Sequence, residues 1–238
     1  MQVLYKDLAV DGVFTSFNLD TSTSIDNLVD HRLSRSSKFI YSSGITITLT
    51  FDTPKTIKGV AVGGSDLSDA TQITVNGNTS TQQAKDGNVF TVLDEDLTAS
   101  IFTIVLTDEG SFTGQNISIG RLMVGDVYQT PGINDNVTLD YIVDTNTSFS
   151  ASRQVYGQPL VNYTSIFVQI PVVEQDERSA LQSFQGSVMN YKPFFLNFDE
   201  DCFDEGPFYA ILGGQNSFGY QFNGAHFWTI GLTFDEVF

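Results

Sequence analysis

The clearest feature of the sequence is the strict alternation of apolar and polar residues from Ile45 to Phe51. A period of two places one set of side chains in a core and the other in water, which predicts a half-buried β-strand. Further short apolar segments are also predicted to be strands: 57–62, 72–75, 89–93, 101–106, 117–124, 137–143, 165–173, 194–198, 208–212 and 226–234. The pattern as a whole predicts an all-β protein.

The residues between these segments favour turns. Asn76-Gly77 is typical of a hairpin turn, and the stretch from Asp86 to Asn88 predicts another. We expect 52–55 to form a turn between two strands, and Gly63-Gly64 to end the second of them. Short strands joined by such turns at regular intervals are typical of a β-sandwich or a jelly roll.

The segment 117–126 is expected to close the first part of the fold. Its alternation slips at Gly120-Arg121, and Gly125-Asp126 is predicted to end the strand. A second set of strands follows it. The chain has 238 residues, which is enough for two domains of about 100–130 residues each. We therefore predict a jelly-roll sandwich at 1–126 and a β-rich domain at 127–238.

One segment of the second half, 175–185, shows a helical pattern. Its acidic residues lie near the start, where they interact favourably with the helix dipole, and Leu181 and Phe184 share one face. Gly186 is predicted to end the helix. The expected fold class is therefore all-β with one short helix.

Composition narrows the classes of function. Hydrophobic residues make up 41% of the chain and include 20 phenylalanines, so real cores are expected. The formal net charge of −17 disfavours binding to nucleic acid or to anionic membrane surfaces. The single cysteine, Cys202, excludes an intrachain disulfide. We expect no signal peptide, because 1–6 lacks its basic and apolar regions, and no apolar run reaches the roughly 20 residues of a membrane-spanning helix.

The densest group of charged side chains is an acidic stretch after the strand predicted at 194–198. It contains Asp199, Glu200, Asp201, Asp204 and Glu205. Such a loop binds a cation through oxygen ligands, faces a basic partner surface, or is simply solvated. Its spacing does not match a calcium-binding EF-hand loop. A second, shorter acidic stretch is 94–96.

The main basic cluster lies in a polar stretch at 20–38, which is expected to be an ordered surface loop with at most one helical turn. Its members are His31, Arg32, Arg35 and Lys38. On an acidic protein this cluster can dock against an acidic face of a neighbouring copy, and such head-to-tail contacts close a ring. An exposed basic loop without a partner is the alternative.

No residues form a recognisable catalytic or cofactor-binding set. His31 and His226 are the only histidines, and the acidic neighbours of Cys202 disfavour its thiolate. A zinc site needs more nitrogen and sulfur ligands than these residues supply. The sequence also lacks a phosphate-binding loop, since the glycines at 213–214 are not followed by the required lysine. We therefore predict a protein without catalytic residues, metal or cofactor.

Two family resemblances add expectations. The first half resembles galactose-binding-like jelly rolls of the discoidin type, through the stretches 27–30, 45–51, 57–62 and 120–125. Many such domains bind sugars through loops at one end. The resemblance therefore implies a jelly roll that is able to bind a host-surface glycan.

Most of the chain also resembles a tail protein of tailed bacteriophages. The residues that carry this resemblance are the stretches 119–126, 131–134, 144–148 and 152–157. It implies a virion protein of the tail tip, baseplate or tail adaptor. Its partners would be other phage tail proteins and further copies of itself in a ring.

Three hypotheses about function follow. The first is a non-enzymatic structural protein of a phage tail, synthesised in the host cytoplasm. The alternative is a carbohydrate-binding module for attachment to the host surface. The third is a hydrolase that cleaves surface polysaccharide.

Overall fold

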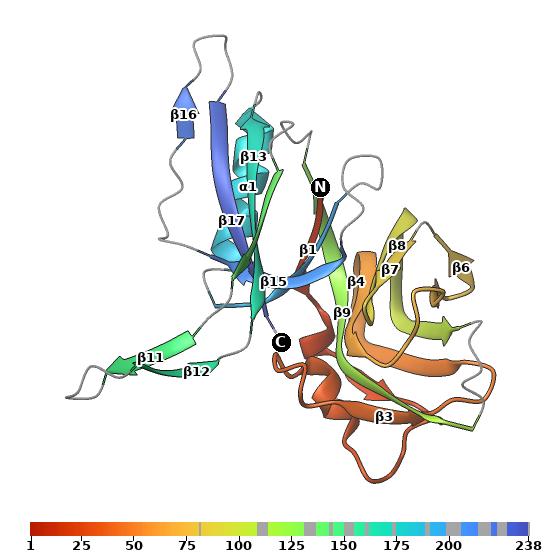
Figure 1. Ribbon diagram of the computed structural model, residues 1–238. Coiled ribbons are helices and arrows are strands. Elements are labelled where there is room, and N and C mark those ends of the chain that lie inside the picture. Colours follow the sequence, from red (N-terminus) through yellow and green to blue (C-terminus); the bar gives the residue numbers. More distant parts are fainter. Residues whose placement is uncertain are drawn as a thin grey trace.

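The computed structural model describes residues 1–80, 82–108, 114–130, 137–142, 145–149, 155–159, 162–172, 175–188, 191–198, 206–213, 220–222 and 228–237. Within these residues the protein is all-β with a single α-helix, as predicted (Figure 1). The strands up to residue 130 are β1 (Gln2–Asp7), β2 (Val13–Thr15), β3 (Ser37–Ile40), β4 (Ile45–Ser65), β5 (Gln72–Val75), β6 (Asn78–Thr79), β7 (Gln82–Lys85), β8 (Asn88–Thr107) and β9 (Asn116–Gln129).

In the described part of the second half, the elements are eight further strands and the helix α1 (Gln175–Val188). The strands are β10 (Val137–Ile142), β11 (Thr145–Phe149), β12 (Val155–Pro159), β13 (Tyr163–Val172), β14 (Phe194–Asn197), β15 (Phe208–Leu212), β16 (Tyr220–Phe222) and β17 (Trp228–Glu236). Two 3-10 turns, η1 (Ala9–Asp11) and η2 (Ile25–Val29), lie among the early strands. No helix of the described residues is both long enough and apolar enough to cross a membrane.

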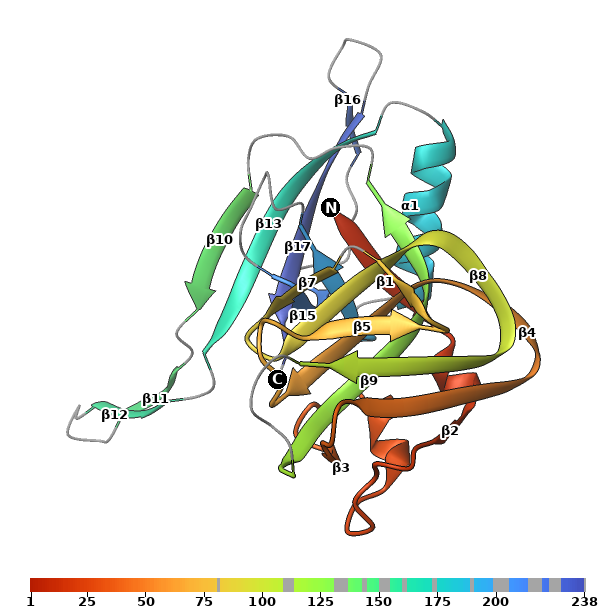
Figure 2. The ribbon, with the colours of Figure 1, turned by 90° about the vertical axis from the view of Figure 1, so that its right-hand side faces the viewer.

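The first half is a jelly-roll-like sandwich of two layers. The outer layer contains β2, the start of β4, the end of β8, β5 and β6. The central layer contains β7, the start of β8, the end of β4, β9 and β1. β4 and β8 thus belong to both layers, and Figure 2 shows them curving together from one layer into the other.

The turn predicted at 52–55 is wrong, because β4 bends there and continues as one strand. Pairing with β8 stops at Thr50, opposite Ile101, and resumes at Lys55, opposite Ala99. Several residues of β4 are therefore inserted against one residue of β8. Such a bulge bends a strand without ending it, and it tolerates Pro54 because no ladder hydrogen bond is needed there.

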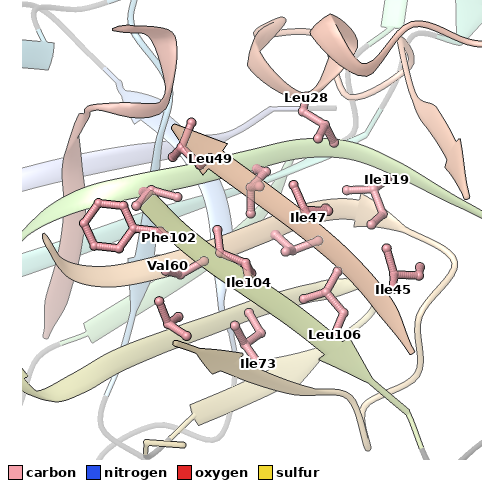
Figure 3. Close-up of a cluster of buried hydrophobic side chains, with 14 of the residues drawn as sticks. Leu28, Ile45, Ile47, Leu49, Val60, Ile73, Phe102, Ile104, Leu106 and Ile119 are labelled. Carbon is pink, nitrogen blue, oxygen red and sulfur yellow. The ribbon is translucent and has the colours of Figure 1, made fainter. Parts of the chain in front are cut away.

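The core between the two layers confirms the half-buried strand predicted from the alternation at 45–51. Ile45, Ile47 and Leu49 are fully buried. They lie opposite Leu106, Ile104 and Phe102 of β8, respectively, and Figure 3 shows this cluster of side chains. Burying each such side chain stabilises the fold by about 1.5–3 kcal/mol.

The central layer is buried on both of its faces. Leu122 and Val124 of β9 pack in the core of the sandwich, whereas Met123 between them packs in a second core with residues of the later strands. Ala61 of β4 likewise faces the second core, between Val60 and Val62, which face the first. This double burial explains why 122–124 is apolar throughout and does not alternate.

The strand end predicted at Gly125-Asp126 is also wrong, since β9 continues to Gln129. Gly125 lies opposite Asp7 of β1 on one side and Gly59 of β4 on the other. A Cβ atom on Gly125 would overlap the backbone oxygen of Lys6. The glycine therefore permits a close approach of two strands here and does not end one of them.

The N-terminal strand joins the two halves of the chain. β1 pairs with β9 on one side and with β14 on the other. The sheet continues from β14 through β15, β17 and β13 to β10. One antiparallel sheet therefore runs through both halves, and whether 1–126 and 127–238 fold as separate domains stays a prediction.

Helix α1 covers the second core and confirms the helix predicted at 175–185. Leu181 and Phe184 are fully buried, and Val188 is nearly so. The helix continues through Gly186 to Val188, beyond the predicted end. Burial of Val188 explains this difference, because its packing outweighs the cost of about 1 kcal/mol for a glycine inside a helix.

Candidate functional site

A polar hollow of about 380 Å³ lies at the end of the outer layer. It lies between the β5–β6 hairpin and 93–97, where β8 bends. Its polar lining residues are Asn78, Thr79, Ser80, Asp94, Glu95 and Asp96. Leu93 and Leu97 add apolar surface. The volume lies within the range of about 300–1,000 Å³ that is typical of small-molecule sites.

Local backbone geometry positions the rim of this hollow. Asn76 and Gly77 have φ angles of 50° and 81°, which is the left-handed geometry of a tight hairpin turn, as predicted. The Asn76 side chain accepts a hydrogen bond from the Thr103 backbone N–H at 2.7 Å. The backbone N–H of Asp94 donates to Ser80 Oγ at 3.3 Å, which links the hairpin to the bend.

The chemistry of the hollow suits a ligand that donates hydrogen bonds. The side chains of Asp94, Glu95 and Asp96 are exposed, as is Asn78. Ionised carboxylates are acceptors only, so they bind hydroxyl, amine or amide donors. Three of them in one hollow, on a chain of net charge −17, repel an anionic ligand.

The described residues offer no group of three or more histidine, cysteine, aspartate and glutamate side chains placed to hold a metal ion. The acidic stretch with Asp199, Glu200, Asp201, Asp204 and Glu205 lies outside the described residues. The same is true of Cys202 and His226. The possible roles of these residues therefore stay predictions.

The members of the predicted basic cluster have different surroundings in the structure. Arg32 donates two hydrogen bonds to the carboxylate of Asp30, at 2.9 and 2.7 Å, and Arg35 lies 3.5 Å from the same group. Hydrogen bonds from Arg32 hold the pKa of Asp30 well below its usual range. Lys38 lies on β3 with an exposed side chain. A docking role for these residues is not tested by the fold.

His31 lies at the junction of the two halves, beside basic residues that were not part of the predicted cluster. The hydroxyl of Tyr209 on β15 donates to the His31 backbone oxygen at 3.2 Å. Burial, the largest effect, raises the pKa of Tyr209 to about 12. His31 also lines a second cavity, of about 380 Å³, together with Arg121 and Lys192. This junction cavity is a site that the sequence pattern alone does not reveal.

Comparisons with known proteins find similar solved structures, among them the two that follow. No protein-family model matches the sequence, and no curated protein is significantly similar to it. The crystal structure of SpGH29 is similar over 53% of this chain and 29% of that chain, with 15% identity and a TM-score of 0.39.

The second similar structure is the family 32 carbohydrate-binding module of NanJ from C. perfringens, solved in complex with galactose. The similarity covers 54% of this chain and 100% of that chain, with 11% identity and a TM-score of 0.37. Because both scores and identities are low, the function proposed for this chain rests on its own residues. Neither structure is described as a phage tail protein, so the tail role stays a prediction.

Proposed function

We propose that the protein is a non-catalytic binding protein whose polar hollow binds a neutral carbohydrate. The observation that carries this proposal is the lining of the hollow. It combines three carboxylates, an amide and hydroxyl groups with the two leucines Leu93 and Leu97.

This combination matches the surface of a sugar. Sugar hydroxyls donate hydrogen bonds to carboxylate and amide oxygens, and the apolar faces of the ring pack on aliphatic side chains. The negative charge at Asp94, Glu95 and Asp96 favours neutral sugars over acidic ones. The resemblance of the first half to galactose-binding-like jelly rolls, which bind sugars through loops at one end, agrees with this location.

A glycan array followed by calorimetry tests the proposal. We expect the intact protein to bind a neutral glycan without cleaving it. Asp94→Ala is expected to weaken binding at least about tenfold, the equivalent of one lost hydrogen bond to a charged group. Asp52→Ala is the matched control, because Asp52 is also an exposed acidic residue of the first half but does not line the hollow.

Three results would overturn the proposal. One is the absence of binding to any neutral glycan. Another is equal loss of affinity in Asp52→Ala and Asp94→Ala. Release of shorter saccharides during the incubation would instead identify the protein as a hydrolase, the third hypothesis from the sequence.

A second candidate function is assembly with other copies of the chain, the part of the phage-tail hypothesis that the β11–β12 hairpin supports. Among the described strands these two pair only with each other, from Thr145 opposite Pro159 to Phe149 opposite Val155. Both views show the hairpin projecting from the rest of the protein (Figures 1 and 2). A two-stranded hairpin is only marginally stable alone in water, so contact with a neighbouring copy would stabilise it.

Analytical ultracentrifugation tests this second candidate. We expect the full chain to sediment as a closed oligomer, and a variant in which 145–159 is replaced by a short glycine-serine linker to sediment as a monomer. A full chain that stays monomeric at all concentrations would contradict the ring. Unchanged oligomers in the linker variant would exclude the hairpin from the contact.

A further inference from the structure

The junction cavity lies where β1, β9, α1 and the loop carrying His31 meet. Lys6 and Asp7 come from β1, Arg121 and Met123 from β9, and Lys192 from the segment before β14. The cavity is separate from the polar hollow, since the two share no lining residue.

Arg121 is the central group of this cavity. Its side chain is only 1% exposed although it lines the cavity. Nη2 donates to Asp7 Oδ2. Nε and Nη1, by contrast, are buried and have no hydrogen-bond partner among the described residues. A buried guanidinium with free donors on two nitrogens destabilises the protein unless an acceptor binds there.

Asp7 does not meet this need, because its carboxylate already makes other hydrogen bonds. Oδ1 accepts the backbone N–H groups of Ala9, at 2.9 Å, and Val124, at 3.4 Å. Burial raises the pKa of Asp7, and the guanidinium of Arg121 opposes that effect. No described side chain supplies the missing acceptor, which leaves these donors for a bound ligand.

The surroundings of Arg121 are positively charged. Lys6 and Lys192 line the same cavity with exposed side chains, and His31 lies beside them. Burial lowers the pKa of His31, and the positive charges of Arg121 and Lys192 lower it further, whereas Asp30 opposes them. This basic cavity is notable on a chain of net charge −17, and it attracts anions locally.

We propose that the junction cavity binds a small organic carboxylate, which accepts hydrogen bonds from the unpaired N–H groups of Arg121. A hydrogen bond between a guanidinium N–H and a carboxylate oxygen is charge-assisted and therefore strong. A single negative charge suits the site better than a phosphate dianion, because Asp7 already balances part of the positive charge. Val10 and Met123 line the same cavity and give the apolar part of the ligand a surface to pack on.

NMR titration of the full chain with benzoate tests this proposal, with benzyl alcohol as the neutral control and inorganic phosphate as the second anion. At constant ionic strength we expect benzoate to shift the Arg121 Nε–H resonance saturably, and benzyl alcohol to leave it unchanged. Lys192→Ala keeps the buried pair intact and is expected to weaken benzoate binding roughly two- to five-fold, because it removes one exposed charge.

A pH series gives an independent readout. Protonated His31 adds a positive charge, so benzoate binding should tighten as the pH falls below 6.5, the ordinary histidine value. His31→Gln should reduce this dependence, and Asp7, whose pKa is raised by burial, is the other titratable group beside Arg121. No response of Arg121 to any anion, or an equal response to benzyl alcohol, would overturn the proposal. Tighter binding of phosphate than of benzoate would overturn the choice of a carboxylate.

Discussion

Replacing Phe184 by alanine is expected to lower the free energy of unfolding by about 3–5 kcal/mol, the usual cost of removing a buried aromatic ring. Phe184 is fully buried on α1. Its ring centroid lies 5.5 Å from that of Tyr5 on β1, 6.2 Å from that of Tyr128 on β9 and 5.3 Å from that of Phe194 on β14. The side chain therefore joins the helix to strands of both halves.

Urea unfolding followed by circular dichroism measures this effect. Ser183→Ala is the matched control on the same helix turn, since Ser183 is exposed and is expected to change stability by less than about 0.5 kcal/mol. If Phe184→Ala lowered the free energy of unfolding by no more than the control, the packing of this ring would not hold the helix against the strands of both halves.

Gly125→Ala is expected to destabilise the protein by about 3 kcal/mol, at the upper end of the usual cost of overpacking. The added Cβ would overlap the backbone oxygen of Lys6, which cannot rotate away as a side chain does. β1 and β9 would have to separate where Gly125 faces Asp7. Because β1 also pairs with β14, the change should loosen the connection between the halves.

Thermal unfolding measures this second effect, at about 2–4 °C per kcal/mol for a chain of this size. Gly186→Ala is the matched control, because a Cβ there meets no atom within 4 Å. In a helix that substitution should stabilise the protein by about 0.4–1 kcal/mol. Equal melting temperatures for Gly125→Ala and the intact protein would show that β1 and β9 are not in close contact.

Local sequence patterns predict much of this fold because many elements depend on interactions between residues that are close along the chain. The alternation from Ile45 to Phe51 identifies a strand with one buried face, and the Asn76-Gly77 pair identifies a hairpin turn. Leu181 and Phe184 identify the inward face of the only described α-helix. In each case the deciding interaction lies within a few residues along the chain.

Patterns fail where the deciding contact is distant in sequence. Pro54 predicts a turn, but pairing with β8 on both sides of it keeps β4 in one bent strand. Gly125 predicts a strand end, but its small size instead admits the backbone of Lys6. The apolar run 122–124 carries a signal of its own, since continuous apolar residues are typical of a strand buried on both faces.

The sequence does not predict either candidate site, because each combines segments that are distant along the chain. The polar hollow combines 77–80 with 93–97, and these segments meet only because the hairpin packs against the bend of β8. Arg121 offered a usable signal, because a charge inside an apolar strand needs a partner or a function. Its position beside His31 and Lys192 depends on how the two halves meet.

The central claim is that the polar hollow binds a neutral carbohydrate, and the most direct test is an NMR titration of the isotope-labelled protein. The titrant is the glycan that binds most tightly on the array. The account predicts saturable shifts confined to the backbone amides of 77–80 and 93–97. Shifts that cluster elsewhere, or no shifts at saturating glycan, would contradict it.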